Sequence, residues 1–250
     1  MTQPTVQAQS ASAAAPQSPS LGFVGRVVGV IVSPKETFAH IARDPRPFMM
    51  LAFVSLVAAV GTAIFFRTEV GQLAWLDAAV RQREAFGVEV DDTQYAAMER
   101  IAGFMGYIVP AYSLVVGPLI TMILAGIIKA AFAIISGAEA TFKQTLGVVA
   151  ASGVVVLVQQ CFVLPLNYFR ETMTSATSLG AFLPMLPETS FPARFLGTID
   201  LFLVWWVMVL AIGLGVLFRR PTKTIALTLF AVYLIIALAV ATVTTMAGGS

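Results

Sequence analysis

Four polar side chains in the apolar part of this sequence could take part in chemistry: Lys129, Gln159, Gln160 and Asp200. A carboxylate in an apolar run could bind a proton or a cation, or it could cap a helix near the interface. Side-chain amides in the same setting usually form hydrogen bonds between helices. A lysine near the end of an apolar helix usually extends its ammonium group to the membrane surface. We interpret all four residues as candidate intramembrane or partner contacts, and capping near the outer interface is the simpler interpretation of Asp200.

The residue types that most enzymes and metal sites require are nearly absent. Cys161 is the only cysteine and His40 the only histidine, so the sequence predicts neither an intrachain disulfide nor a Cys/His metal site. An intramembrane protease would need a Ser–His pair or two aspartates, and Asp200 is alone in its apolar run. We therefore predict no enzymatic activity, no cofactor and no nucleic-acid partner.

The composition is that of a membrane protein. Hydrophobic residues make up 58% of the chain and charged residues only 11%, whereas soluble domains have about 25% charged residues. A helix needs roughly 20 apolar residues to cross about 30 Å of hydrocarbon. The predicted fold class is all-α, a polytopic membrane helical bundle of five transmembrane helices with short N-terminal interfacial amphipathic helices. The predicted spans are 48–66, 107–129, 142–166, 196–218 and 225–246.

The segment before this membrane domain (48–246) differs from it in polarity. Residues 1–20 are rich in Ala, Ser, Gln and Pro without charge, which predicts a disordered cytoplasmic tail. Residues 21–47 contain two apolar stretches too short to span a bilayer, which predicts interfacial amphipathic helices. Gly25 and Gly29 have a spacing that permits close helix contact, but we interpret this common spacing as incidental.

Two polar segments separate the spans on the outer side. The outer loop 67–103 is the largest, and apolar residues at near-helical spacing predict that part of it is helical. Residues 168–194 contain three prolines and few charges, and we predict that they fold back onto the outer membrane surface.

Two short motifs have the pattern of a helix capping box. Ser33 is followed three residues later by Glu36, and Thr141 is followed three residues later by Gln144. Pro34 suits the first position of a helix, where its missing N–H costs nothing. We assign structural roles to the four capping residues.

The distribution of charge predicts the orientation. The short inner segments carry nine basic and three acidic residues, and the outer segments carry six basic and nine acidic residues. Short loops rich in Lys and Arg are retained in the cytoplasm, so the N-terminus is predicted inside and the C-terminus outside. The Ala-rich, Lys-poor composition favours a bacterial cytoplasmic (inner) membrane.

Two segments resemble motifs of a known family. Ser-Pro-Lys-Glu-Thr-Phe at 33–38 and Gly-Ala-Glu-Ala-Thr-Phe-Lys-Gln-Thr at 137–145 resemble motifs of bacterial members of the Yip1 domain family. The resemblance covers roughly residues 25–245 and implies five spans, a cytoplasmic N-terminus and a role as a membrane scaffold or adaptor. Eukaryotic relatives are associated with vesicle trafficking and small GTPases, and we do not transfer that role to this chain.

Two functions follow from these observations. The first is a non-enzymatic scaffold or adaptor that binds protein or lipid partners in the bilayer. Membrane lipids and other membrane proteins are the expected partners, and an oligomer is compatible with the sequence. The alternative is a small transporter or permease subunit, because Pro110, Pro118, Gln159, Gln160 and Asp200 could form a site at broken helices. Five spans without an obvious inverted repeat weigh against that alternative.

Overall fold

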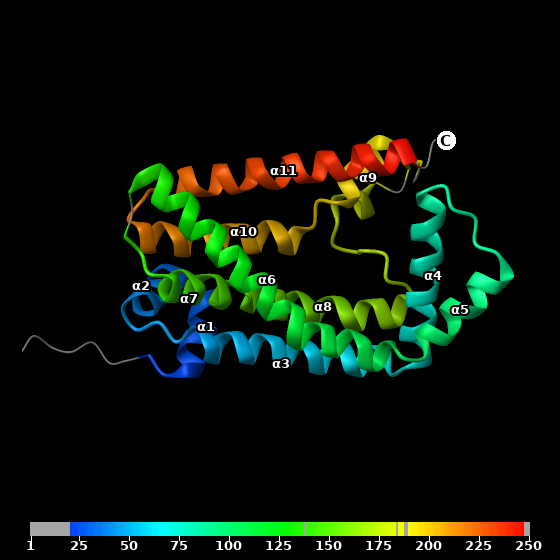
Figure 1. Ribbon diagram of the computed structural model, residues 1–250, viewed down its shortest axis with the longest axis horizontal. Helices are drawn as coiled ribbons and strands as arrows, with labels where there is room; N and C mark the ends of the chain where they lie inside the picture. The colour runs from blue at the N-terminus through cyan, green and yellow to red at the C-terminus, as the bar shows by residue number, and fades with distance from the viewer. Residues whose placement is uncertain (1–20, 138, 184, 188–189, 248–250) are drawn as a thin grey trace, which may run out of the picture.

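All regular secondary-structure elements in the described part of the chain are helices. The computed structural model describes residues 21–137, 139–183, 185–187 and 190–247, and the predicted tail 1–20 lies outside this part (Figure 1). The predicted all-helical membrane bundle is confirmed. The elements are α1 (Phe23–Val32), α2 (Pro34–Arg43), α3 (Pro47–Phe66), α4 (Glu69–Ala85), α5 (Asp92–Ala102), α6 (Met105–Ser136), α7 (Phe142–Ser152), α8 (Val154–Arg170), η1 (Leu179–Phe182, a 3-10 turn), α9 (Phe191–Gly197), α10 (Leu201–Phe218) and α11 (Thr222–Ala247).

Five helical segments are long and apolar enough to cross a membrane. They run along the long axis of the molecule, and α6 crosses the others obliquely (Figure 1). The helix that contains the predicted span 107–129 is longer than predicted, and the span predicted to begin at 196 begins at Leu201. The segments are Pro47–Phe66, Met105–Ile134, Phe142–Arg170, Leu201–Phe218 and Thr222–Met246.

The third of these segments consists of two helices that meet at Gly153. The Gly153 amide donates to Ala150 O at 3.2 Å, so the turn tightens here to a three-residue hydrogen bond. A Cβ atom on Gly153 would lie 3.0 Å from Ala150 O and 3.2 Å from Val54 Cγ1. The glycine thus permits both the tight turn and the close approach of α3.

The core lies where α2, α7 and α10 meet. Phe38 of α2 is fully buried, together with Leu146 of α7 and Leu214 of α10. A Cβ atom on Gly213 would lie 2.6 Å from Val148 Cγ1 and 3.0 Å from the Phe38 ring. Because α10 has no side chain at this position, α2 packs directly against the bundle.

Helix α1 is held to α2 by another close contact. A Cβ atom on Gly29 would lie only 2.3 Å from Thr37 Oγ1, and Thr37 is buried. The interpretation of Gly29 as incidental is therefore wrong, because the α1–α2 contact has no room for a larger residue. The nearest atoms to a Cβ on Gly25 belong to Leu21, one turn earlier in the chain.

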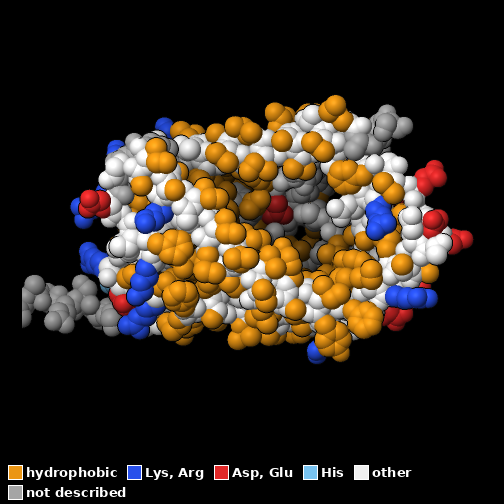
Figure 2. Space-filling view, viewed as in Figure 1, with side chains coloured by type: hydrophobic (Ala, Val, Ile, Leu, Met, Phe, Trp, Pro, Cys, Tyr) orange, Lys and Arg blue, Asp and Glu red, His pale blue; other side chains and the backbone are white. Residues whose placement is uncertain are grey.

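The two ends of the bundle differ in charge. At one end, α4 and α5 form a helical hairpin in which acidic residues predominate (Figures 1 and 2). Thr68 caps α4, and Asp91 Oδ1 caps α5 by accepting the Gln94 amide at 2.7 Å. We call this the acidic end. The opposite, basic end comprises α1, α2, the start of α7 and the turn between α10 and α11, and its basic residues include Lys35, Arg43, Arg46, Lys143, Arg219, Arg220 and Lys223.

The close packing at Gly213 predicts that Gly213→Ala lowers the thermal midpoint in detergent. Overpacking of this kind costs about 1–3 kcal/mol, which exceeds the gain of about 1 kcal/mol from replacing a helical glycine. Gly126→Ala is the matched control, because a Cβ atom on Gly126 of α6 would meet only Phe142 Cε2, at 4.0 Å. The control should leave the midpoint unchanged or raise it. Equal midpoints for the two variants would contradict the packing at Gly213.

Candidate functional site

Asp200 caps α10 and also binds residues from other elements. Its Oδ1 accepts the amides of Phe202 and Leu203 at 2.8 and 3.2 Å, which satisfies two donors of the first helical turn. The same oxygen accepts Gln159 Nε2 of α8 at 3.3 Å. Its Oδ2 accepts the hydroxyl groups of Ser175, at 3.2 Å, and of Thr177. One carboxylate thus joins α8, α10 and the loop between them.

Backbone and tyrosine contacts strengthen this junction. The Leu201 amide donates to Thr177 O at 3.0 Å, and the Leu179 amide donates to Ile199 O at 2.8 Å. The hydroxyl of Tyr233, on α11, accepts the Asp200 amide at 3.2 Å and donates to Thr198 O at 2.8 Å. We call the side chains of Gln159, Ser175, Thr177, Asp200 and Tyr233 the Asp200 cluster.

The Asp200 cluster lies deeper in the bundle than the sequence suggested. Tyr233 is near the middle of α11, so Asp200 is level with that point and not with the end of the helix. The loop between α8 and α10 includes α9, which lies beside the second half of α11 (Figure 1). The Arg194 guanidinium of α9 donates to Thr244 O near the end of α11. This part of the loop therefore packs along α11, and its position on the outer membrane surface stays a prediction.

The surface is hollowed in the middle of one face. Figure 2 shows this hollow between the helices, with an acidic side chain at its floor. Around Asp200 itself, five hydrogen bonds reach the carboxylate, and every donor is an amide or a hydroxyl group of the chain. Within the described residues no basic side chain forms an ion pair with it. This arrangement suits a carboxylate that holds segments together.

The remaining intramembrane candidates lie apart from the Asp200 cluster. Gln160 Nε2 donates to Ala58 O of α3 at 3.1 Å, and the side chain packs against Gly61. Gln159 and Gln160 therefore bind different neighbours, since adjacent residues on a helix point about 100° apart. Lys129 is exposed on α6 and has no hydrogen-bond or ion-pair partner in the described part of the chain.

Only one of the two predicted capping boxes forms. The Gln144 amide donates to Thr141 Oγ1 at 3.3 Å, and the Thr141 amide donates to Gln144 Oε1 at 2.9 Å. Gln144 Nε2 also donates to Ala42 O at 2.8 Å, which ties α7 to α2. The capping residues of α7 therefore also fix the position of the N-terminal helices.

The predicted capping box of Ser33 and Glu36 is wrong. Ser33 is the N-cap residue of α2, but its side chain accepts no hydrogen bond from the helix. It is the single residue between α1 and α2, and its amide closes α1 by donating to Gly29 O at 2.8 Å. Its ψ of 63° lies outside the extended region that directs a capping side chain toward the helix amides.

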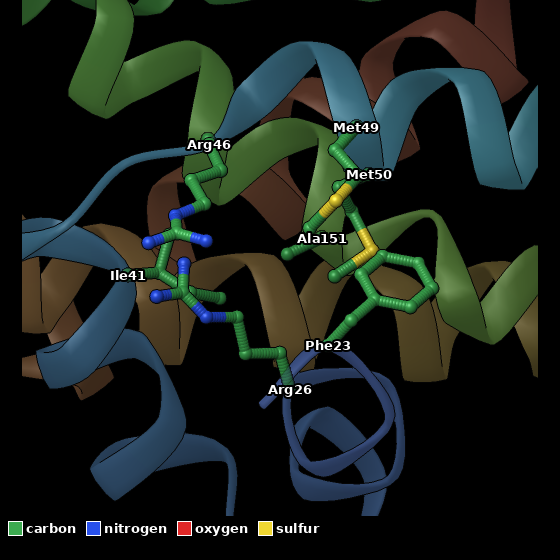
Figure 3. Close-up of a pocket in the computed structure, with 8 residues that line it drawn as sticks. Phe23, Arg26, Ile41, Arg46, Met49, Met50 and Ala151 are labelled. Carbon is green, nitrogen blue, oxygen red and sulfur yellow. The ribbon is translucent and has the colours of Figure 1, made fainter. Parts of the chain in front are cut away.

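A buried arginine that we did not single out from the sequence anchors α1. Arg26 is 6% exposed, and its guanidinium donates to Asp44 O at 2.7 Å and to Asp44 Oδ2 at 2.5 Å. Arg46 Nε lies 3.1 Å from the same carboxylate oxygen, and the two guanidinium groups lie side by side (Figure 3). The hydrogen bond from Arg26 is the main reason that the pKa of Asp44 is lowered. The signal in the sequence was a lone cation in an apolar stretch, which must find a partner.

The cavity beside Arg26 and Arg46 is too small for a ligand. Its volume is about 10 Å³, which is room for about one water molecule. Apolar side chains such as Phe23, Met49 and Met50 form most of its wall (Figure 3). The described residues also contain no group of three or more His, Cys, Asp or Glu that could hold a metal ion.

Comparison with protein families matches residues 28–244 to the Yip1 domain. The match begins within α1, extends into α11 and includes both motifs in which we saw the resemblance. Comparisons with curated proteins and with solved structures find no match.

The contacts of Asp200 predict that Asp200→Ala destabilises the loop between α8 and α10. The substitution removes a helix cap, worth about 0.5–2 kcal/mol, and leaves the donors of the Asp200 cluster without their acceptor. Hydrogen exchange should become faster in residues 172–200, and the thermal midpoint should fall. Asp200→Asn, which keeps an oxygen acceptor, should have a smaller effect.

Asp91→Ala is the control for the Asp200 cluster, because it removes only a helix cap in the acidic hairpin. It should change exchange in α5 and leave residues 172–200 protected. Unchanged protection of that loop in Asp200→Ala would contradict the role of the carboxylate.

The lowered pKa of Asp44 predicts how the attachment of α1 depends on pH. A carboxyl group whose pKa is lower in the folded protein stabilises the fold at pH values above its pKa in the unfolded chain, which is about 3.9. This contribution is lost as the pH falls through the pKa of the folded protein. The protection factors of residues 23–32 should be constant from about pH 5 to pH 8 and should fall below about pH 4. In Asp44→Asn, residues 23–32 should have low protection factors at every pH. If this variant kept the loss of protection below about pH 4, that loss would be due to a group other than Asp44.

Proposed function

This chain belongs to the Yip1 domain family, and we propose that it is a non-enzymatic membrane scaffold or adaptor that binds protein or lipid partners. Family members are multi-pass membrane proteins that are generally non-enzymatic. We further propose that the basic end faces the cytoplasm of a bacterial cytoplasmic membrane, because short loops rich in Lys and Arg are retained on that side.

The rigid attachment of α1 and α2 to the basic end is the observation that carries this proposal. Phe38 is fully buried in the core of the bundle, and Gln144 and Arg26 add hydrogen bonds to the segment 42–44. The opposite side of α2 exposes charged residues, including Lys35 and Glu36. A fixed helix with an exposed charged face is a suitable surface for a partner, because little conformational entropy is lost when the partner binds.

The alternative of a transporter or permease subunit has one observation in its favour. Asp200 lies beside the middle of α11, and carboxylates inside a membrane domain often mark ion or substrate paths. The five hydrogen bonds to the carboxylate support the scaffold instead, since through them its two oxygens hold α8, α10 and the loop between them together. Substrate or proton flux into liposomes that contain the purified chain, and its loss in Asp200→Asn, would favour the transporter.

The adaptor function predicts a defined cross-linked product at the exposed side of α2. A photoreactive residue at Lys35 or Glu36 should capture the same partner in native membranes. The same residue at Glu84, which is exposed on α4 at the acidic end, should not capture it. Immunoblotting and mass spectrometry of the products measure this difference. The same products at all three positions, or none at α2, would contradict a partner surface on α2.

A further inference from the structure

A crevice that none of the contacts above explains lies at the basic end, between α2, α7 and α10. Its volume is about 380 Å³, within the usual range of small-ligand sites, about 300–1,000 Å³. Arg43 of α2 and Arg219, at the end of α10, line it together with Gln144 of α7. Ala39, Ala42, Val216 and Leu217 form the apolar part of its wall. None of the described residues that line the crevice is acidic.

Neither arginine in this crevice has a partner within the described part of the chain. The ion pairs there join Arg26 and Arg46 to Asp44, and Arg81 to Asp77. Arg43 and Arg219 form no ion pair and donate no side-chain hydrogen bond to any described residue. Gln144, by contrast, is held by its bonds to Thr141 and Ala42. Two guanidinium groups thus remain available to one ligand.

The backbone of Arg219 supports a role for its side chain. Arg219 has φ 53° and ψ 43°, the left-handed conformation that usually requires glycine at the end of a helix. Glu171 is the only other described residue besides glycine with a positive φ. A glycine would relieve this strain, so an arginine here is unfavourable for folding alone.

The site also lies where a lipid head group would be. Arg219 connects α10 to the turn before α11, and both helices are long enough to cross a membrane. The positive end of α7 is at the crevice. Arg220 in the same turn and Lys223 at the start of α11 add positive charge but do not line the crevice.

We propose that Arg43 and Arg219 bind the phosphate of an anionic phospholipid head group in this crevice. Guanidinium groups bind phosphate oxygens through strong charge-assisted hydrogen bonds. The apolar wall accepts the glycerol and the first methylene groups of the lipid. This inference rests on the proposed adaptor function and deepens it by naming one partner as a lipid.

The test measures how lipids stabilise the full-length chain purified in a neutral detergent. Phosphatidylglycerol should raise the thermal midpoint in a concentration-dependent manner, and phosphatidylcholine should raise it much less. In Arg43→Gln/Arg219→Gln the apparent affinity for phosphatidylglycerol should be at least about tenfold weaker. Arg220→Gln/Lys223→Gln is the matched control, because it removes two positive charges from the same end at residues that do not line the crevice, and it should keep most of the affinity.

Arg219→Gly separates binding from folding. It should raise the midpoint in the absence of lipid, because glycine suits the left-handed position, and it should weaken stabilisation by phosphatidylglycerol. If both double variants lost affinity equally, the effect would be general charge and the site would be wrong. Unchanged affinity in Arg43→Gln/Arg219→Gln would also overturn the proposal, and equal stabilisation by glycerol 3-phosphate would overturn its assignment to a lipid.

Cross-linking at Lys35 and Glu36 distinguishes failure of the lipid site from failure of the adaptor function. A captured protein partner with no preference for phosphatidylglycerol would reject only the lipid site. A lipid preference that depends on Arg43 and Arg219, without a captured protein, would reject only a protein partner on α2.

Discussion

Inside a membrane-spanning bundle there is no bulk water, so each polar group must find its partner within the protein. The Asp200 cluster satisfies this requirement for a carboxylate that is level with the middle of α11. The two amides of α10, the amide of Gln159 and the hydroxyl groups of Ser175 and Thr177 all donate to it. A loop that would otherwise lie outside the bundle thereby becomes part of it. The length of α10 follows from the same contacts, since the helix begins where its capping residue is held.

The same requirement shapes the basic end, where a cation and not an anion is buried. Arg26 would be costly on an apolar helix, but its hydrogen bonds to Asp44 link α1 to the chain just before α3. At Gly29 of α1 and Gly213 of α10, the absence of a side chain lets α2 pack directly against both helices. The bonds between Arg26 and Asp44 set the position of α1, and the two glycines allow α2 to contact α1 and α10 closely. The two N-terminal helices are therefore part of the folded domain, although neither could cross a membrane.

The sequence alone predicted the features that depend on local composition. Five apolar runs have the length of membrane spans, and the capping box of Thr141 and Gln144 depends on four consecutive residues. It did not predict the partners of Asp200, because Gln159, Ser175 and Tyr233 are brought to it by packing between distant segments. Ser33 shows the same limit within a local motif, since its place between two helices changes its backbone angles and prevents capping.

In this membrane domain, the polar groups that do not contribute to the fold are a guide to function. Asp200, Arg26 and Gln144 all have partners in their own chain, which explains their presence by stability. Arg43 and Arg219 have no such partner among the described residues, and Arg219 is less favourable for folding than glycine would be in its backbone conformation. Residues that lower the stability of the fold and whose side chains form no polar contact within it are the ones that indicate a ligand. By this reasoning, the function of the described domain is to be sought at its basic end and not in its interior.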